Sequence, residues 1–330
     1  AAADHFLRVS RMAPTSKIRP TAEFDAAAAL IKLKDWGMAA TVLSGFRDVF
    51  PDHDLQPEVT KKIAYVYRED GKLSQAASEY ERIERESRDP EVRREALLIA
   101  AELHEEALDH ASALDVYLRY VDHFPRPVEL NVETRSKIAE MLKAANDRQR
   151  YLKELEAIVS IDAVAGDDRT GRTRLLAAHA ALVLAEPGYD RFVAVRLEQP
   201  FDVNLRRKRD LMKATTQEFA RLIDYEIGDV TAAATFYLAE IYAHFSTALM
   251  ESERPTGLSP LESEQYELAI EEQAYPFEEQ AIAVHESNLK LIGLGVYNDW
   301  IDRSLQKLAE FVPARYARPE EVSDIVRSLD

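Results

Sequence analysis

The 330-residue chain contains no cysteine and only 10 glycines. The absence of cysteine excludes disulfides, thiolate metal sites and cysteine nucleophiles. The scarcity of glycine leaves few positions for tight β-turns, and the abundance of alanine, glutamate, leucine and arginine favours helix. No window reaches 18 uninterrupted apolar residues, so we expect no transmembrane segment in this sequence. These shortages indicate an all-α fold.

Patterns that carry catalysis or cofactor binding are also missing. No H-E-x-x-H sequence occurs, and His104 and His110 are spaced so that they lie on different helix faces. Residues 166–173 approach the phosphate-binding loop G-x-x-x-x-G-K-[ST], but Arg172 replaces its lysine and two aspartates stand inside the cradle. We therefore predict a non-enzymatic chain with no cofactor and no metal site.

Basic residues are fewer than acidic ones, 42 against 59, and the two kinds are segregated along the chain. The formal net charge is −17, and residues 251–286 contain ten acids against one base. Nucleic acid is excluded as a partner, because phosphate neutralisation drives that binding. One basic run opposes this trend: Arg206, Arg207, Lys208 and Arg209. It could contact an acidic partner, a lipid headgroup or the acidic helices of the same chain.

A repeated spacing of small residues is the main positive signal. Two sets of alanines recur every 37 residues, and the members of the second set precede a large apolar residue by four positions. The first set is Ala27, Ala64 and Ala101, and the second set is Ala39, Ala76 and Ala113. Small residues let two helices approach closely, and a large residue one turn later fills the gap beside the contact. A fixed period of this length indicates stacked repeats.

Helix-breaking residues divide these repeats into hairpins. Pro51, Pro90 and Pro125 fall between the units, and Gly71 lies between the two helices of the second unit. A single hairpin cannot bury its apolar face, whereas stacked neighbours can. Residues 20–126 therefore resemble the tetratricopeptide repeat, whose usual period is about 34 residues. The resemblance implies a right-handed superhelical solenoid that serves as a protein–protein interaction scaffold.

The resemblance also implies a binding face, because the first helix of each tetratricopeptide hairpin lines a concave groove. Its register assigns these protein-binding residues: Glu58, Lys61, Tyr65, Arg68, Glu95, Leu98, Glu102 and Glu105. Family members that clamp a terminal carboxylate use lysine and asparagine at such positions. Only Lys61 and Arg68 fit that pattern, so we expect a protein or peptide partner of another kind.

The sequence predicts three regions. Residues 1–19 form an N-terminal segment, 20–203 hold three clear and two degenerate repeats, and 204–330 continue the solenoid with longer helices. The degenerate pairs are expected at 133–145 with 150–161, and at 172–185 with 189–197. The long helices are expected at 205–227, 230–252, 260–291 and 296–311. A final amphipathic stripe, at 320–329, predicts a cap or the first helix of a continued repeat.

Residues 228–317 carry a second resemblance. Tyr275-Pro276-Phe277, His285-Glu286-Ser287-Asn288 and Tyr297-Asn298-Asp299-Trp300 follow one another there. This order is similar to that of large proteobacterial tetratricopeptide proteins found with TonB/ExbB/ExbD-type transport systems or assigned to gliding motility. The resemblance implies a periplasmic scaffold in the cell envelope with a possible membrane-associated partner complex. A cytoplasmic adaptor or co-chaperone is the alternative, and the oligomeric state stays open.

Overall fold

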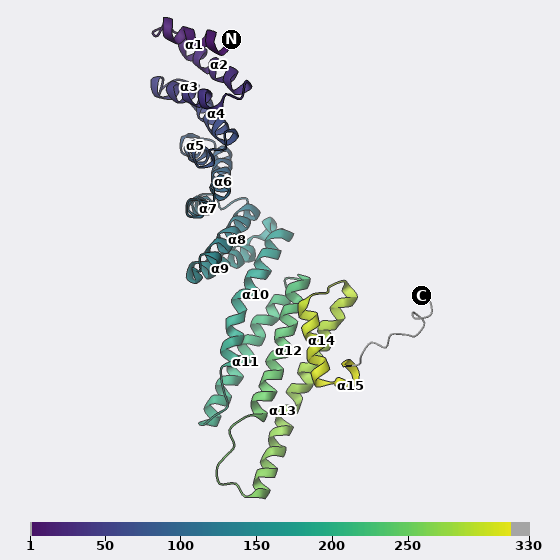
Figure 1. Ribbon diagram of the computed structural model, residues 1–330. Helices are drawn as coiled ribbons and strands as arrows, with labels where there is room; N and C mark the ends of the chain where they lie inside the picture. The colour runs from purple at the N-terminus through teal and green to yellow at the C-terminus, as the bar shows by residue number, and fades with distance from the viewer. Residues whose placement is uncertain (1, 318–330) are drawn as a thin grey trace, which may run out of the picture. The chain divides into compact units, whose positions relative to one another are not determined.

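The computed structural model describes residues 2–317 of the chain, and their regular secondary structure is helical throughout (Figure 1). The all-α prediction is therefore confirmed for this range. Internal contacts divide the chain into two compact units, Ala1–Glu154 and Leu155–Asp330. The stripe predicted at 320–329 lies outside the described residues.

The N-terminal unit is a series of short helices joined by tight turns, in which each helix packs on the next (Figure 1). Its helices are α1 (Ala2–Met12), α2 (Arg19–Lys32), α3 (Trp36–Val49), α4 (Gln56–Glu69), α5 (Leu73–Glu86), α6 (Pro90–Glu106), α7 (His110–His123) and α8 (Val128–Ala144). Helix α9 (Arg148–Val164) spans the boundary between the units. The region predicted as an N-terminal segment thus contains a helix, and α1 packs on α2.

The repeated alanines occupy the helix contacts that their spacing predicted. All six are fully buried: Ala27, Ala39, Ala64, Ala76, Ala101 and Ala113. Leu43 and Tyr117, one turn beyond the second alanine of their repeats, are buried as well. A side chain no larger than a methyl group lets the paired helices approach closely, which explains why the repeat holds alanine at these points.

The turns inside the hairpins repeat with nearly the same period, at intervals of 37, 37 and 38 residues. Lys34, Gly71, Leu108 and Asn146 each adopt a positive φ, between 58° and 72°, directly after a helix end. A left-handed residue at this position ends a helix and lets the chain reverse. In three of the four turns the next residue is an aspartate that accepts a hydrogen bond from the backbone N–H three residues later: Asp35, Asp109 and Asp147.

A second periodic device joins each hairpin to the one before it. The Gln56 amide donates to the carbonyl oxygens of Arg47 and Phe50, and the Asn131 amide donates to those of Val121 and Phe124. Arg93, at the equivalent place, donates to the carbonyl of Glu84. These side chains satisfy carbonyls that the end of a helix leaves without partners.

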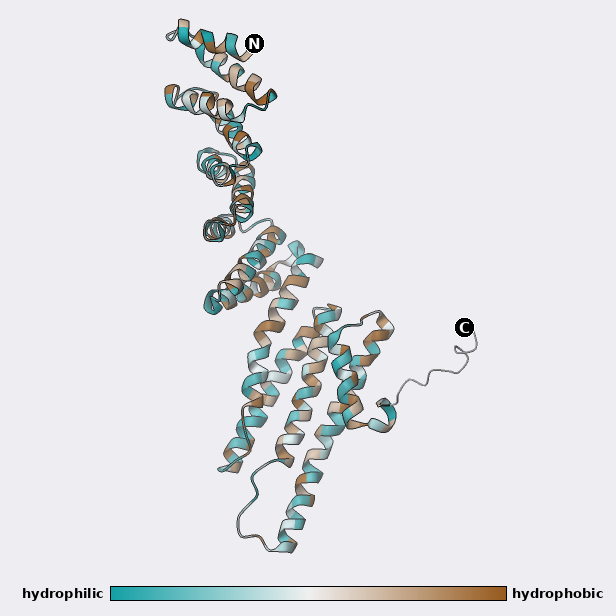
Figure 2. Cartoon of the chain, in the orientation of Figure 1, coloured by the Kyte–Doolittle hydropathy of each residue, from teal (hydrophilic) through white to brown (hydrophobic). Residues whose placement is uncertain are grey.

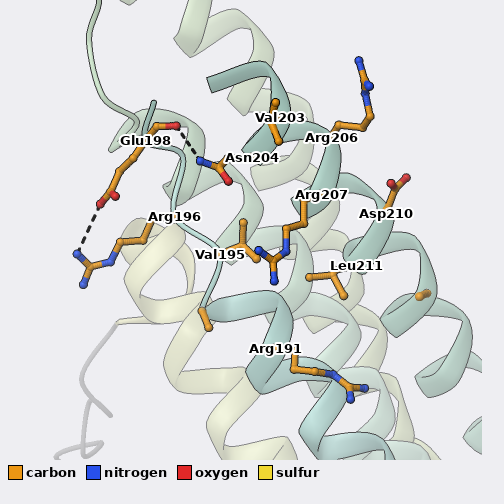
Figure 3. Close-up of a pocket in the computed structure, with 12 residues that line it drawn as sticks. Arg191, Val195, Arg196, Glu198, Val203, Asn204, Arg206, Arg207, Asp210 and Leu211 are labelled. Atoms are coloured by element: carbon orange, nitrogen blue, oxygen red, sulfur yellow. Dashed lines mark hydrogen bonds and ion pairs between the residues drawn. The ribbon is translucent and has the colours of Figure 1, made fainter. Parts of the chain in front are cut away.

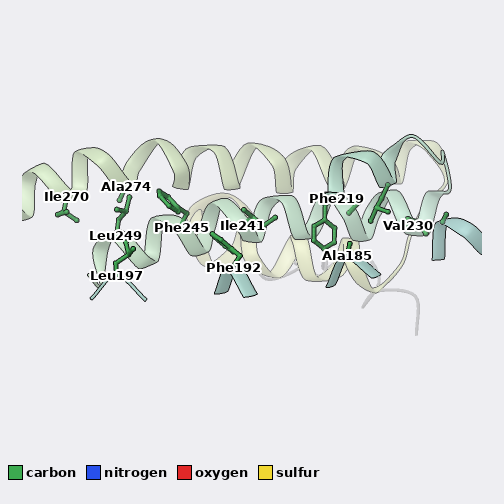
Figure 4. Close-up of a cluster of buried hydrophobic side chains, with 13 residues drawn as sticks. Ala185, Phe192, Leu197, Phe219, Val230, Ile241, Phe245, Leu249, Ile270 and Ala274 are labelled. Atoms are coloured by element: carbon green, nitrogen blue, oxygen red, sulfur yellow. The ribbon is translucent and has the colours of Figure 1, made fainter. Parts of the chain in front are cut away.

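The C-terminal unit contains longer helices, as predicted. They are α10 (Gly171–Val193), α11 (Phe201–Ile223), α12 (Gly228–Met250), α13 (Pro260–Leu289) and α14 (Asp299–Phe311), with short helices η1 (Gly166–Asp168), η2 (Lys290–Leu294) and α15 (Pro313–Tyr316). Helix α12 contacts α10, α11, α13 and α14, and apolar residues occur along most of its length (Figure 2). Phe192, Phe219 and Phe245 are fully buried in the core around it (Figure 4).

The fifth predicted hairpin, 172–185 with 189–197, is wrong. Residues 171–193 form the single helix α10, which continues through Pro187 and pairs with α11. Ala178, Ala185 and Phe192, each seven residues apart, are buried in one cluster on both sides of the proline. This continuous apolar face keeps the helix intact although proline removes one backbone hydrogen bond.

Candidate functional site

The predicted protein-binding residues lie on two consecutive first helices of the N-terminal unit. Glu58, Lys61, Tyr65 and Arg68 are exposed on α4, where they follow one another at successive turns along one side of the helix. On α6, Glu95 and Glu102 are exposed, whereas Leu98 and Glu105 are half-buried. We call these eight residues the first-helix face. Their role in binding stays a prediction.

On α4, contacts with neighbouring residues hold the side chains of this face in place and leave their outer surfaces exposed to solvent. Lys61 pairs with Glu58 over 3.0 Å, one turn away, and both side chains are about half exposed. The ring of Tyr65 meets the edge of Trp36 at 6.1 Å between centroids, with its own surface 46% exposed. The Arg68 side chain forms no ion pair and no hydrogen bond with another described residue. The exposed ring of Tyr65, with the unpaired guanidinium of Arg68 on the same helix, can contact both apolar and acidic groups of a partner.

On α6, one acid of the face is already engaged within the unit. The Tyr117 hydroxyl donates to the Glu105 carboxylate, and the Lys137 ammonium lies 3.6 Å from the same carboxylate. Burial, followed by the contact with Glu105, raises the pKa of Tyr117. Glu105 therefore joins α6, α7 and α8, while Glu95 and Glu102 remain free for a partner.

A pocket of about 410 Å³ adjoins the first-helix face, beside Lys61. The start of α4, the end of α5 and the start of α6 form it, with Ile83 and Val92 as apolar lining and Arg88 as a second cation. Its volume lies toward the lower end of the range for ligand pockets and is large enough for one large side chain of a partner protein.

The basic run on α11 is only partly a surface patch. Arg206, Arg207 and Arg209 are exposed, but Lys208 is fully buried, which corrects its assignment to the charged patch. Its ammonium donates to the carbonyl oxygens of Phe192 and Val195, at 3.0 and 2.7 Å. Lys208 points inward because α11 turns this position toward the end of α10, where free carbonyls attract a cation.

Arg206 and Arg207 line a pocket of about 930 Å³ in the C-terminal unit (Figure 3). The end of α10, the connecting segment 194–200 and the start of α11 form its wall. Arg191 and Arg196 add two further guanidinium groups. Nothing in the sequence pattern assigned these two arginines, because they stand apart from the basic run and meet it only through the α10–α11 turn.

The pocket lining combines positive charge with apolar surface. Four arginines face two acids, and of these groups only Arg196 and Glu198 approach each other, at 3.7 Å. The apolar lining residues are Ala194, Val195, Val203, Leu211 and Ala214. In Figure 3 the Arg207 side chain lies between Val195 and Leu211.

The phosphate-loop resemblance at 166–173 corresponds to a helix connection. Asp162 is buried, accepts a bidentate pair from Arg169 at 2.8–3.1 Å, and accepts a hydrogen bond from the Thr173 hydroxyl at 2.9 Å. Thr170 and Thr173 also form a reciprocal cap at the start of α10. The threonine that would hold a nucleotide's metal ion is thus fully buried in this network.

One buried cluster has the residue types of a hydrolase triad. His285 Nδ1 lies 3.2 Å from the Ser304 hydroxyl, and His285 Nε2 lies 3.3 Å from Glu240. Ser304 and His285 have no exposed surface, so a substrate cannot reach the hydroxyl. Asn288 donates to Ser304 and to the carbonyl of Ala232. The cluster therefore holds α12, α13 and α14 together.

Residues 2–317 contain neither a metal-binding cluster nor a membrane-spanning helix. No group of three or more histidine, aspartate or glutamate side chains there is arranged to hold a metal ion. In the same range, none of the helices is both long enough and apolar enough to span a bilayer.

Comparison with known proteins gives a family match for part of the chain. A crystal structure of a tetratricopeptide repeat protein from Parabacteroides merdae has 16% identity over 88% of this chain and 98% of its own, with a TM-score of 0.33. The C-terminal part of a tetratricopeptide repeat-containing protein from Cytophaga hutchinsonii has 10% identity over 93% and 99%, with a TM-score of 0.31. None of the curated proteins matches the chain. Residues 95–126, which include most of α6 and all of α7, match the tetratricopeptide repeat family.

Proposed function

We propose that this chain is a non-enzymatic scaffold that binds a protein partner on its first-helix face. The observation that carries the proposal is the position of the family match. The tetratricopeptide repeat at 95–126 includes Glu95 and Glu102, whose carboxylates are exposed and unpaired among the described residues. Hairpins of this family generally mediate protein–protein interaction, and the same face continues onto α4 with Tyr65 and Arg68.

The chemistry of the face defines the expected partner. On α4 the face carries Lys61, which is paired with Glu58, and the unpaired Arg68, so this part has a net positive charge. On α6 the face carries only carboxylates, so a partner that crosses both helices meets a net positive and then a negative surface. Tyr65 supplies a rigid aromatic contact between the charges. This polarity favours one binding orientation, because the reversed partner would place like charges together.

The proposal extends to a cellular setting, a bacterial envelope assembly for transport or motility. It rests on the resemblance of residues 228–317 to large proteobacterial tetratricopeptide proteins of such systems. Fractionation of the native organism with an antibody to the chain tests the setting. Recovery with the periplasm or envelope supports it, and recovery only with the cytoplasm supports an adaptor in that compartment.

The binding proposal is tested by affinity capture with three forms of the chain. One is the unaltered chain, one carries Lys61→Glu, Tyr65→Ala and Arg68→Glu, and a matched control carries Gln75→Glu, Ser78→Ala and Arg85→Glu on α5. All six positions except Tyr65 are polar and all are exposed, so each form should fold. A partner of the first-helix face is retained by the control and lost from the α4 variant. Equal recovery from all three forms would contradict the proposal.

A further inference from the structure

We propose that the arginine pocket of the C-terminal unit binds an acidic segment of a partner protein that also carries a large apolar side chain. We define the arginine pocket by Arg191, Arg196, Arg206 and Arg207 with the apolar residues between them. The inference goes beyond the proposed function, because it concerns another unit of the chain and a ligand of stated charge.

Three arginines of the arginine pocket carry positive charge that no acid among the described residues pairs with. The side chains of Arg191, Arg206 and Arg207 form no ion pair and no hydrogen bond with another described residue. Within residues 2–317, none of these three guanidinium groups is therefore paired with an acidic helix of the chain. In a chain with a net charge of −17, three unpaired arginines along one hollow make a locally positive site. A guanidinium group binds carboxylate in a bidentate manner, so these groups suit aspartate and glutamate side chains.

Hydrogen bonds hold the wall of the arginine pocket in place. Lys208 holds the end of α10 and the connecting segment through the carbonyls of Phe192 and Val195. The Asn204 amide donates to the Glu198 carbonyl at 3.0 Å. Glu253, just beyond the C-terminal end of α12, accepts a hydrogen bond from the Gln199 N–H at 2.7 Å. A wall fixed before binding loses little entropy on binding, which favours affinity.

The volume of the arginine pocket and its apolar lining favour a peptide over a free anion as the ligand. The volume of about 930 Å³ lies near the upper end for small-molecule sites and is far larger than one phosphate or carboxylate group needs. Val195, Val203 and Leu211 provide an apolar floor that an inorganic anion cannot use. A segment with acids on one side and a leucine or phenylalanine on the other uses both features.

The strongly acidic surface of the whole chain decides against two other polyanions. Nucleic acid and anionic membranes are extended sheets or rods of negative charge, so they would approach the acidic surroundings as well as the pocket. A short peptide reaches only the pocket and avoids this repulsion. A second copy of the chain is disfavoured for the same reason, since each copy carries −17.

The test selects ligands from a library of random short peptides displayed on phage, with the full chain as the target. Arg191→Ala with Arg207→Ala removes two guanidinium groups of the pocket, and Arg209→Ala with Lys213→Ala is the control on exposed positions of α11 outside it. The expected peptides combine acids with a large apolar residue. The pocket variant should weaken them by about tenfold or more, and the control by about twofold or less.

Four results would overturn the proposal. The first is that no acidic peptide is enriched, and the second is that the selected peptides bind both variants equally. The third is that no peptide binds, while the chain binds an anionic vesicle or an oligonucleotide and the pocket variant does not. The fourth is that no peptide binds, while the chain self-associates and the pocket variant does not. The α4 variant of the first-helix face should bind the selected peptides normally. Failure of this inference is therefore distinguishable from failure of the proposed function.

Discussion

The side-chain amide of Asn131 donates to the carbonyl oxygen of Phe124 over 3.0 Å, at the point where α7 ends and α8 has just begun. Asn131 is 2% exposed, and the same amide also reaches the carbonyl of Val121. One buried side chain thus closes the end of one hairpin from the first turn of the next. Gln56 and Arg93 hold the preceding junctions in the same way.

Replacing Asn131 by alanine should therefore loosen one junction. The buried carbonyl of Val121 and the partly buried carbonyl of Phe124 would lose their donor. Leaving a buried acceptor without a partner costs about 1–3 kcal/mol. Hydrogen exchange should report faster opening of α7 and α8, with little change at α2. Gln149→Ala, at an exposed position of α9, is the control. Unchanged exchange in α7 would show that the junction bonds add nothing to stability.

Leu108→Gly should raise stability. Leu108 has φ 60° and is 77% exposed, so it holds a left-handed conformation without burying its side chain. Removing the side chain relieves a strain of about 1–2 kcal/mol, less the entropy that glycine adds to the unfolded chain. Ala107→Gly, at φ −76° in the same turn, should instead lower stability. Denaturant melts compare the two, and a lower midpoint for Leu108→Gly would contradict the strain argument.

Ala101→Leu should destabilise the third hairpin. Ala101 is fully buried between helices, and a larger side chain there overpacks the contact at a cost of about 1–3 kcal/mol. Ala111→Leu on exposed α7 surface is the matched control. Thermal melts should separate the two variants by several degrees for a unit of this size. If Ala101→Leu melts with the parent, the repeat register is wrong.

Lys208 predicts a pH dependence above neutrality. Burial lowers the pKa of Lys208 from 10.5 to about 8. Between these values the unfolded chain binds more protons than the folded chain, so this group makes stability rise with pH. Below pH 8 both states are protonated, and the slope vanishes. The difference in melting temperature between the parent and Lys208→Met should therefore grow in favour of the parent from pH 8 to 10.5. A pH-independent difference would show that the ammonium is not destabilised by burial.

The sequence predicted the features that repeat and missed those that depend on neighbours. Spacing alone located the six buried alanines, because close helix contacts admit only a small residue. The hairpin junctions were also periodic, yet glutamine, arginine and asparagine perform one role there, and differing residue types obscured the period. Asp35, Asp109 and Asp147 carried a cap signal that could have fixed the turns from sequence.

The errors in the C-terminal unit have a common physical cause. The sequence predicted a break between residues 185 and 189, where Pro187 lies, but the apolar face of α10 on both sides of the proline outweighs the lost hydrogen bond. Lys208 was assigned to the surface from its charged neighbours, whereas its helical phase points it at the end of α10. Arg191 and Arg196 could not be joined to Arg206 and Arg207 until the partner of α11 was known. In each case the contacts between helices determined the position of a residue or the end of a helix, and the local sequence pattern did not contain that information.

The central claim is that a protein partner contacts the first-helix face, and a photocrosslinking amino acid placed at Tyr65 tests it most directly. Tyr65 is 46% exposed, so the substitution should leave the fold intact. Irradiation in a native extract should give one dominant covalent adduct from position 65, and a weaker one or none from Ser78 on α5. Adducts of equal yield and identity from both positions, or none from position 65, would contradict the account.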